Sequence, residues 1–192
     1  VAAMAMFGLT LPMTQIAIGD AGAPRLSPWF VTFGRAVVAA GMSAILLRVM
    51  GSPRPTAEQW RLLAVAALGN AIVYPLLLAW ALRSVPTVHA AVVTALAPLT
   101  TSVVAALMLR QRAGAAFWGC AAFGCGLVVA YSLWRAQRAG LGLTLGLEDL
   151  WLALAVLGAS IGYVAGARLT PALGAERVIC WVTLAALPVT LP

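Results

Sequence analysis

The sequence predicts an all-α membrane protein, a polytopic bundle of about seven transmembrane helices. Of its 192 residues, 63% are hydrophobic and only 9% are charged. A soluble domain carries roughly 25% charged residues, so this chain has too few of them to cover its surface in water. Its apolar residues form long runs that lack the period-two alternation of membrane barrel strands. Because lipid offers the backbone no hydrogen-bonding partners, such runs must be helical.

Apolar segments make up most of the chain, and we number them one to seven. They cover residues 1–18, 29–49, 62–82, 85–109, 113–134, 150–169 and 178–192. Most of them have the length of about 20 residues that a helix needs to cross a bilayer. The seventh is shorter, so we expect an incomplete span and a chain that is a fragment of a longer protein.

Tryptophans and arginines support these segment limits. Indole rings prefer the headgroup level of a bilayer. All the tryptophans lie near a segment end, at Trp29, Trp60, Trp80, Trp118, Trp134, Trp151 and Trp181. Arg110 and Arg112 follow segment four. Each of them would cost about 2.5–3.5 kcal/mol at the bilayer centre, so they hold that segment in register.

The distribution of basic residues between the loops predicts the orientation of the chain in the membrane. All twelve of these residues are arginines. The loops after segments two, four and six hold Arg48, Arg54, Arg61, Arg110, Arg112, Arg168 and Arg177. The opposite loops hold Arg25, Arg83, Arg135 and Arg138. The richer side belongs in the cytoplasm, so we expect a multi-pass protein of the cell membrane with a cytoplasmic N-terminus. The arginines form no basic patch, which argues against nucleic acid as a partner.

Proline interrupts segments three and four, at Pro75 and Pro98. Pro98 cannot donate a hydrogen bond to the carbonyl of Thr94, and its ring crowds that turn. Thr94 and Thr101 share the face at the predicted bend. Two interpretations are open: a kink that serves helix packing, or a bend that faces a polar pathway.

Few residues within the segments are candidates for a polar pathway. They are Gln15, Arg35, Asn70, Tyr74, His89, Thr94, Pro98, Thr101 and Tyr163. Arg35 either extends to the interface or faces a cavity and holds an anionic group. His89 is either a hydrogen-bonded residue at a helix end or a group that titrates near neutrality. No carboxylate lies in the middle of a segment, so a relay of buried acids is not expected here.

Segments one and six carry helix-weakening residues at matching places. Gly8 and Pro12 in segment one align with Gly158 and Gly162 in segment six. Such interruptions are typical of a binding site at the interface between two repeats. Glycines spaced four residues apart are equally typical of a helix-packing face.

One enzyme motif and the cysteines need interpretation. Residues 158–162 read Gly-x-Ser-x-Gly, and an intramembrane serine hydrolase would use Ser160 as nucleophile and His89 as base. The motif of soluble hydrolases needs a strand-to-helix turn, whereas this stretch lies in an apolar helix. The cysteines form no Cys-x-x-Cys pair and accompany a single histidine, so neither a metal site nor a cofactor is expected.

The order of these segments resembles one repeat of the EamA-type transporters of the drug/metabolite transporter superfamily. The resemblance rests on "SPWFVTFGRAVVAA", with Arg35, and on "TVHAAVVTALAPLTTSVVAALMLRQRAGAAFWGCAAFGCGLVVAY". "AERVICWVTLAALPVTL" is similar to the second helix of a second repeat. One departure is Gln111, because the family commonly has a glutamate after its fourth helix.

The resemblance implies ten helices in two inverted repeats around a central cavity. Residues 1–134 would form the first repeat, residues 135–149 a connecting loop and residues 150–192 the start of the second repeat. The expected function is that of a secondary transporter, an exporter of amino acids or other small metabolites. The alternatives are the hydrolase above and a membrane scaffold that transports nothing.

The expected partners are a small-molecule substrate, the lipid bilayer and, as a possibility, a second copy of the chain in a homodimer. For a zwitterionic substrate, Arg35 would bind the carboxylate. Asn70 and Tyr74 would accept hydrogen bonds from the amine.

Overall fold

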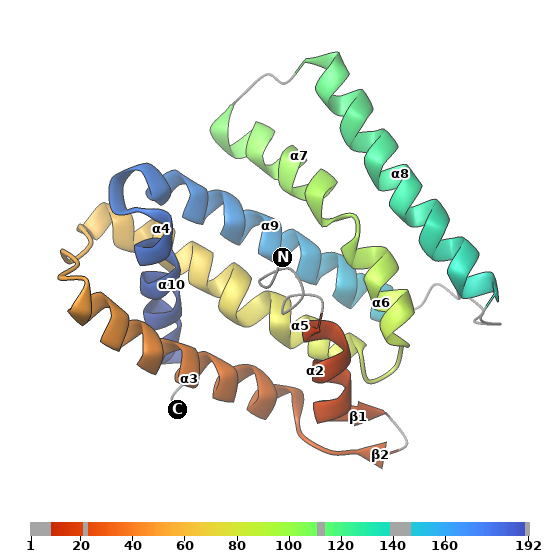
Figure 1. Ribbon diagram of the computed structural model, residues 1–192, viewed down its shortest axis with the longest axis horizontal. Coiled ribbons are helices and arrows are strands. Elements are labelled where there is room, and N and C mark those ends of the chain that lie inside the picture. Colours follow the sequence, from red (N-terminus) through yellow and green to blue (C-terminus); the bar gives the residue numbers. More distant parts are fainter. Residues whose placement is uncertain (1–8, 21–22, 111–113, 139–146, 191–192) are drawn as a thin grey trace.

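A computed structural model describes residues 9–20, 23–110, 114–138 and 147–190. Its helices are α2 (Thr10–Ile18), α3 (Pro28–Val49), α4 (Ala57–Ala67), η1 (Leu68–Val73), α5 (Tyr74–Ala81), α6 (Thr87–Thr94), α7 (Ala97–Leu109), α8 (Ala115–Arg138), α9 (Leu147–Leu173) and α10 (Ala175–Thr190). Two-residue strands, β1 (Gly19–Asp20) and β2 (Ala23–Pro24), pair as a hairpin that the hydropathy pattern did not predict. The all-α fold class is confirmed (Figure 1).

The described helices correspond to the predicted segments. Four are long and apolar enough to cross a membrane, namely Pro28–Val49, Ala57–Ala81, Thr87–Leu109 and Leu147–Leu173. A shorter apolar helix covers Ala115–Tyr131. Residues 1–8 of segment one lie outside the described residues, and with them Gly8.

The span Ala57–Ala81 is one helix with a wider turn inside it. It begins at a capping box, in which the hydroxyl of Thr56 accepts from the N–H of Gln59 and the Gln59 side chain accepts from the N–H of Thr56. In η1 the helix becomes π-helical, and the N–H of Tyr74 donates to the carbonyl of Gly69, five residues back. Pro75 explains the change, because it lacks an N–H and its ring needs room in the preceding turn.

The span Thr87–Leu109 is broken at the place that Pro98 predicts. α6 ends at Thr94, α7 begins at Ala97, and Pro98 occupies the first turn of α7. Proline is tolerated in a first turn, where no N–H is needed. The interruption is therefore a break between two helices, which is a larger change than a kink.

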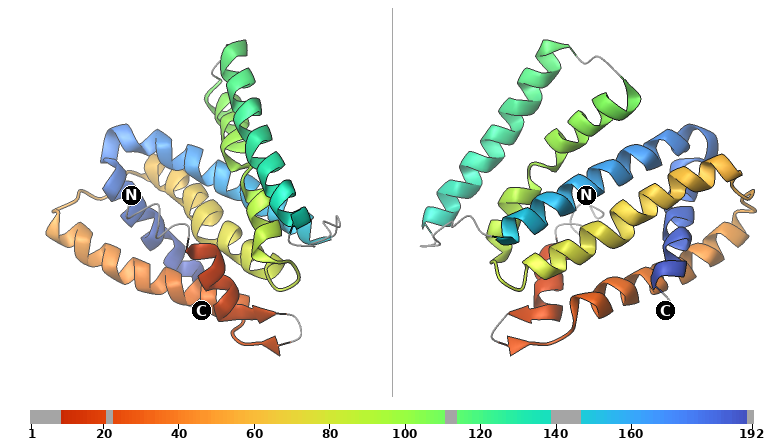
Figure 2. Two further views of the ribbon diagram at one scale, coloured as in Figure 1. Left: turned by 45° about the vertical axis from the view of Figure 1, so that its right-hand side comes forward. Right: turned by 180° about the vertical axis from the view of Figure 1, so that it is seen from behind.

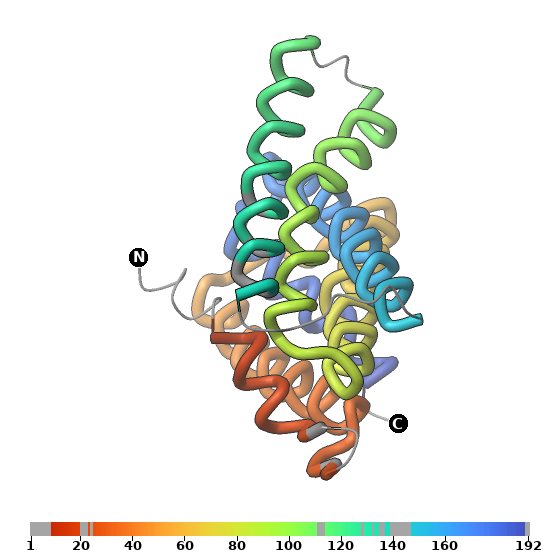
Figure 3. Tube along the Cα trace, turned by 90° about the vertical axis from the view of Figure 1, so that its right-hand side faces the viewer, coloured from red at the N-terminus to blue at the C-terminus, as the bar shows by residue number. Residues whose placement is uncertain are grey.

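Helix α9 occupies the centre of the bundle. It packs against α4, η1, α5, α6, α7 and α10, while α3 packs mainly against α10. α7 and α8 project to one side of the other helices (Figure 2), and α8 runs beside α6 and α7 (Figure 3). The bundle has a hairpin end, where α2 and α5 end near β1 and β2 and where α6 and α9 begin. Its opposite end holds the turn between α9 and α10 (Figure 1).

Two buried clusters hold the bundle together. One joins α4, η1, α9 and α10 around Leu63, Ala165 and Val182. The other lies at the hairpin end and joins α2, α5, α6 and α9 through Ile18, Leu82, Ala90 and Leu152, among other residues. Because lipid is as apolar as these side chains, close van der Waals packing between the helices holds α9 against α4 and α5.

Glycines allow η1 and α9 to touch through their backbones. A Cβ atom added to Gly69 would lie 2.3 Å from the carbonyl oxygen of Gly158. A Cβ on Gly158 would meet Val73 at 2.7 Å, and one on Gly162 would meet Asn70 at 2.7 Å. The packing interpretation of these glycines is therefore confirmed for this crossing.

Candidate functional site

A cavity of about 680 Å³ lies between α3, the helix from α4 to α5, α9 and α10. Small and apolar side chains form most of its wall, including Ala36, Ala66 and Val178. Polar side chains line it from four elements: Arg35 from α3, Asn70 from η1, Tyr163 and Thr170 from α9, and Thr183 from α10. The volume lies within the range of about 300–1,000 Å³ that is usual for small-molecule sites.

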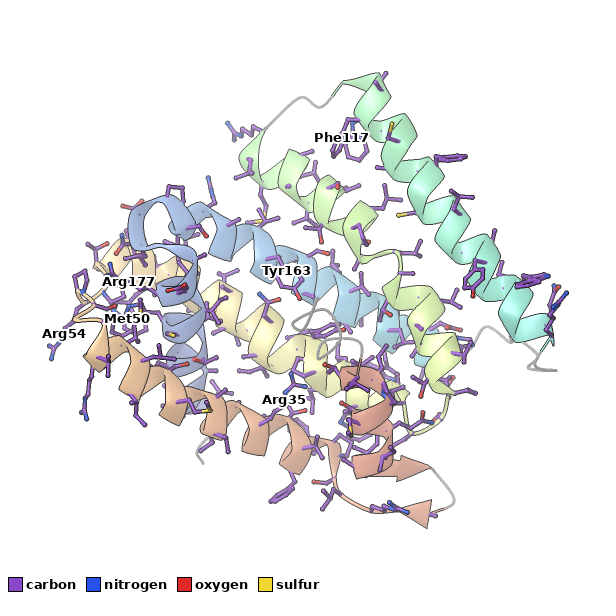
Figure 4. The ribbon with its side chains drawn as sticks, viewed as in Figure 1. Arg35, Met50, Arg54, Phe117, Tyr163 and Arg177 are labelled. Carbon is purple, nitrogen blue, oxygen red and sulfur yellow. The ribbon has the colours of Figure 1, made fainter. Side chains whose placement is uncertain are left out.

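Arg35 is the cation of this cavity. It is seven residues into α3, about 10 Å from the start of that helix. Its side chain is exposed at the cavity wall (Figure 4). No carboxylate pairs with it among the residues that the structure describes. A guanidinium at membrane depth without a carboxylate partner in the described residues is suited to an anionic ligand.

Asn70 is engaged with the backbone of α9. With the amide oriented to satisfy both groups, its nitrogen donates to the carbonyl of Ala159 at 3.2 Å and its oxygen accepts from the N–H of Tyr163 at 3.3 Å. The wider turn of η1 contains Asn70 and lies against this stretch of α9. The sequence predicted Asn70 as a ligand of a substrate amine, whereas the structure gives its amide a partner in α9.

Two tyrosines accompany Arg35. Tyr163 lines the cavity and is 47% exposed. Tyr74 is half-buried against the cluster at the hairpin end, and its phenol interacts electrostatically with both Tyr163 and Arg35. Arg35, Tyr74 and Tyr163 thus lie near one another, on α3, α5 and α9.

The threonines and the proline that were predicted in segment four lie outside the described wall of the cavity. The hydroxyl of Thr94 donates to the carbonyls of Ala90 and Ala91 in its own helix. Thr101 shares a hydrogen bond of 3.0 Å with Ser160, and Pro98 is exposed. None of the three predicted residues, Thr94, Pro98 or Thr101, belongs to the described wall of the cavity.

Gln15 and His89 belong to a second polar group, at the hairpin end. The hydroxyl of Thr87 donates to the side-chain carbonyl of Gln15, which joins α6 to α2. One half-turn further along α6, Nε2 of His89 lies 2.5 Å from Oδ1 of Asp149, in the first turn of α9. Sequence reasoning missed this pair, because Asp149 was assigned to a loop edge and no pattern connects it with segment four.

The hydrolase pair is not formed in this arrangement. Ser160 is fully buried and bonded to Thr101, and it lies eleven residues beyond Asp149 on the same helix. That separation corresponds to about 16 Å along α9. Because His89 bonds to Asp149, its imidazole is far from the hydroxyl that it would have to activate.

The described residues contain no group of three or more His, Cys, Asp or Glu side chains that could hold a metal ion. The cysteines of the described part are unpaired: Cys120 is exposed, and Cys125 and Cys180 are buried.

Comparison with known proteins indicates the family of the chain. The profile of the EamA-like transporter family matches residues 1–133. The chain is 33% identical over 187 residues to YdeK of Bacillus subtilis (strain 168), which is described as an uncharacterized transporter. This match covers 97% of the chain and 62% of YdeK, so the chain spans less than two thirds of that relative. No solved structure matches the chain.

Proposed function

The chain belongs to the EamA-like transporter family, and from this membership we propose that it forms part of a secondary transporter that exports amino acids or similar zwitterionic metabolites. The single observation that carries the proposal is Arg35, a guanidinium without a carboxylate partner in the described residues, at the wall of a cavity of about 680 Å³. α3 and η1 lie within the matched residues 1–133, whereas α9 and α10 lie beyond them. The cavity is thus shared by two parts of the chain, as a site between repeats would be.

The chemistry of the wall favours a carboxylate with a small apolar body. Arg35 can bind a carboxylate in a bidentate manner. The hydroxyls of Tyr163 and Thr170 can accept hydrogen bonds from an amine. Small and apolar residues, mainly alanine and valine, form most of the remaining contact surface, and they would favour an apolar side chain over a charged one.

The arginines also support the proposed orientation, with the N-terminus in the cytoplasm. Arg54 and Arg177, from loops predicted to share one side, lie at the same end of the bundle (Figure 4). We propose a protein of the cell membrane, and the positive-inside rule supports placing that end in the cytoplasm.

A counterflow experiment tests the proposed function. The full-length protein would be reconstituted in proteoliposomes loaded with unlabelled amino acids, one class at a time, and uptake of the labelled form would be measured. We expect saturable counterflow with zwitterionic substrates of small apolar side chain. Absence of counterflow with every carboxylate tested, together with counterflow of a cation, would contradict the proposal. Empty liposomes and liposomes with the Arg35→Ala variant are the controls.

A further inference from the structure

The hydrogen-bonded pair of His89 and Asp149 lies outside the cavity that Arg35 lines. His89 is the sole histidine of the chain. The two side chains are only 10% and 17% exposed, and their interacting atoms are 2.5 Å apart. Because a carboxylate only accepts hydrogen bonds, Nε2 of the imidazole carries the shared hydrogen. Nδ1 is then the position at which a further proton binds.

Buried apolar residues surround the pair on the side that faces the interior of the bundle. Ala90 on α6 and Leu152 on α9 are fully buried in the same cluster, where they pack with Ile18, Leu82 and other residues. Thr87, less than one turn before His89, joins α6 to α2 through Gln15. In such surroundings an uncompensated charge is costly, and His89 supplies a hydrogen-bonding partner for the carboxylate of Asp149.

The pair connects two parts of the chain that belong to different repeats in the proposed transporter. α6 lies within the residues matched by the family profile, and α9 lies beyond them. In inverted-repeat transporters, one repeat rocks against the other around a fixed site. A bond between α6 and α9 at the hairpin end must break if these two helices separate there.

We propose that His89 and Asp149 form a proton-binding site that holds the hairpin ends of α6 and α9 together, and that its proton controls how readily these ends separate. The inference rests on the proposed transport function. An imidazole is the side chain that ordinarily changes charge between about pH 5 and 8. With one proton more, the imidazole becomes imidazolium, and the attraction between two opposite charges is added to the existing hydrogen bond with the carboxylate.

Other charged groups near the hairpin end are few in the described residues. α2 contributes none, β1 contains Asp20, and α9 contributes Glu148 next to Asp149. Arg25 follows β2, and its guanidinium donates to the carbonyl of Ile16 at 3.5 Å. After α5, the guanidinium of Arg83 lies 5.9 Å from the ring centroid of Trp80. At the end of α8, Arg138 lies over Trp134 at 4.2 Å, and Tyr131 precedes both.

The direction of the effect follows from the charges. Acid conditions favour the imidazolium and therefore the closed hairpin end. Under alkaline conditions the imidazole is neutral, the attraction to Asp149 is weaker, and the hairpin ends of α6 and α9 separate more readily. Each opening event then releases the proton from Nδ1 to water at that end, and each closing event takes one up.

Spin labels at the hairpin end test this inference directly. In the full-length protein with its cysteines replaced, Ser84→Cys before α6 and Leu150→Cys in the first turn of α9 place labels on exposed positions beside the pair. Pulsed electron paramagnetic resonance then gives the distance distribution at pH 5.5 and at pH 8.5. We expect the population in which the two labels are far apart to be about threefold larger, or more, at pH 8.5 than at pH 5.5. One linked proton allows at most about a tenfold change per pH unit. A distribution in the unmodified pair that does not depend on pH would overturn the proposal.

Variants separate the proton from the hydrogen bond. His89→Gln keeps a donor that does not titrate, and Asp149→Asn removes the charge of the acceptor. In each variant we expect the distance distribution and the flux to lose their dependence on pH. A pH response that persists unchanged in both would assign the proton to another group and contradict the inference. Because the label distances need no substrate, a protein without flux would refute the proposed function while leaving this test intact.

Discussion

The side chain of Asn70 holds the backbone of Tyr163, with its amide oxygen 3.3 Å from the N–H of Tyr163 and its nitrogen 3.2 Å from the carbonyl of Ala159. This contact places a residue of η1 against the stretch of α9 that carries the cavity tyrosine. Asn70 is thus a positioning residue for the proposed ligand site, in which Tyr163 and Arg35 are the groups that face the ligand.

Asn70→Ala should destabilise the protein and disturb the cavity. Removal of the amide leaves two polar contacts with α9 unmade, and the expected loss is about 1–3 kcal/mol. Thermal unfolding in detergent measures it, with Leu68→Ala at an exposed position of the same turn as the control. An unchanged melting temperature for Asn70→Ala would mean that the amide does not bind α9.

Gly69→Ala should weaken the crossing of η1 and α9. Its Cβ would lie 2.3 Å from the carbonyl oxygen of Gly158, so one helix has to move. We expect a loss of about 1–3 kcal/mol. Gly126→Ala on α8 is the matched control, because nothing lies within 4 Å of its added Cβ. Equal stability of the two variants would contradict the close approach of the helices.

Ser160→Ala should leave transport nearly intact. The hydroxyl of Ser160 is fully buried and bonded to Thr101 at 3.0 Å, so its loss costs about 0.5–1.5 kcal/mol of stability. Flux and melting temperature of the purified variant measure the two effects. Complete loss of activity in a folded variant would restore the interpretation of Ser160 as a nucleophile.

Cysteine labelling should place the two ends of the bundle on opposite sides of the membrane. A single cysteine at Arg54 is expected to react only after the membrane is permeabilised, and one at Arg25 is expected to react from outside. The reverse pattern would show that the N-terminus is outside.

Local patterns of the sequence predicted the helices well, because lipid imposes helical structure on any long apolar run. Segment two was predicted at residues 29–49 and is found as Pro28–Val49. A kink was predicted at Pro98 because a missing N–H acts locally, and the structure has a break between two helices at that place. Arg35 was predicted to face either the interface or a cavity, and it lies at a cavity wall.

Contacts between distant helices could not be predicted in the same way. Hydropathy distinguishes segments that lie in lipid from segments that lie in water, but it does not show which apolar helices pack against each other. The pairs His89–Asp149 and Thr101–Ser160 join residues about sixty positions apart. The role of Asn70 depends on the π-helical turn, and no periodicity of the sequence indicates that turn.

The central claim is that Arg35 binds the anionic group of the substrate in the cavity. Counterflow by proteoliposomes that contain equal amounts of full-length protein tests it most directly, with Arg35→Ala, Arg35→Lys and, as control, Arg54→Ala at an exposed loop position. We predict that Arg35→Ala abolishes counterflow, that Arg35→Lys reduces it, because an ammonium lacks the bidentate fit of guanidinium, and that Arg54→Ala leaves it unchanged. Counterflow of Arg35→Ala at the wild-type rate would show that this arginine only extends to the membrane interface and that the substrate binds elsewhere.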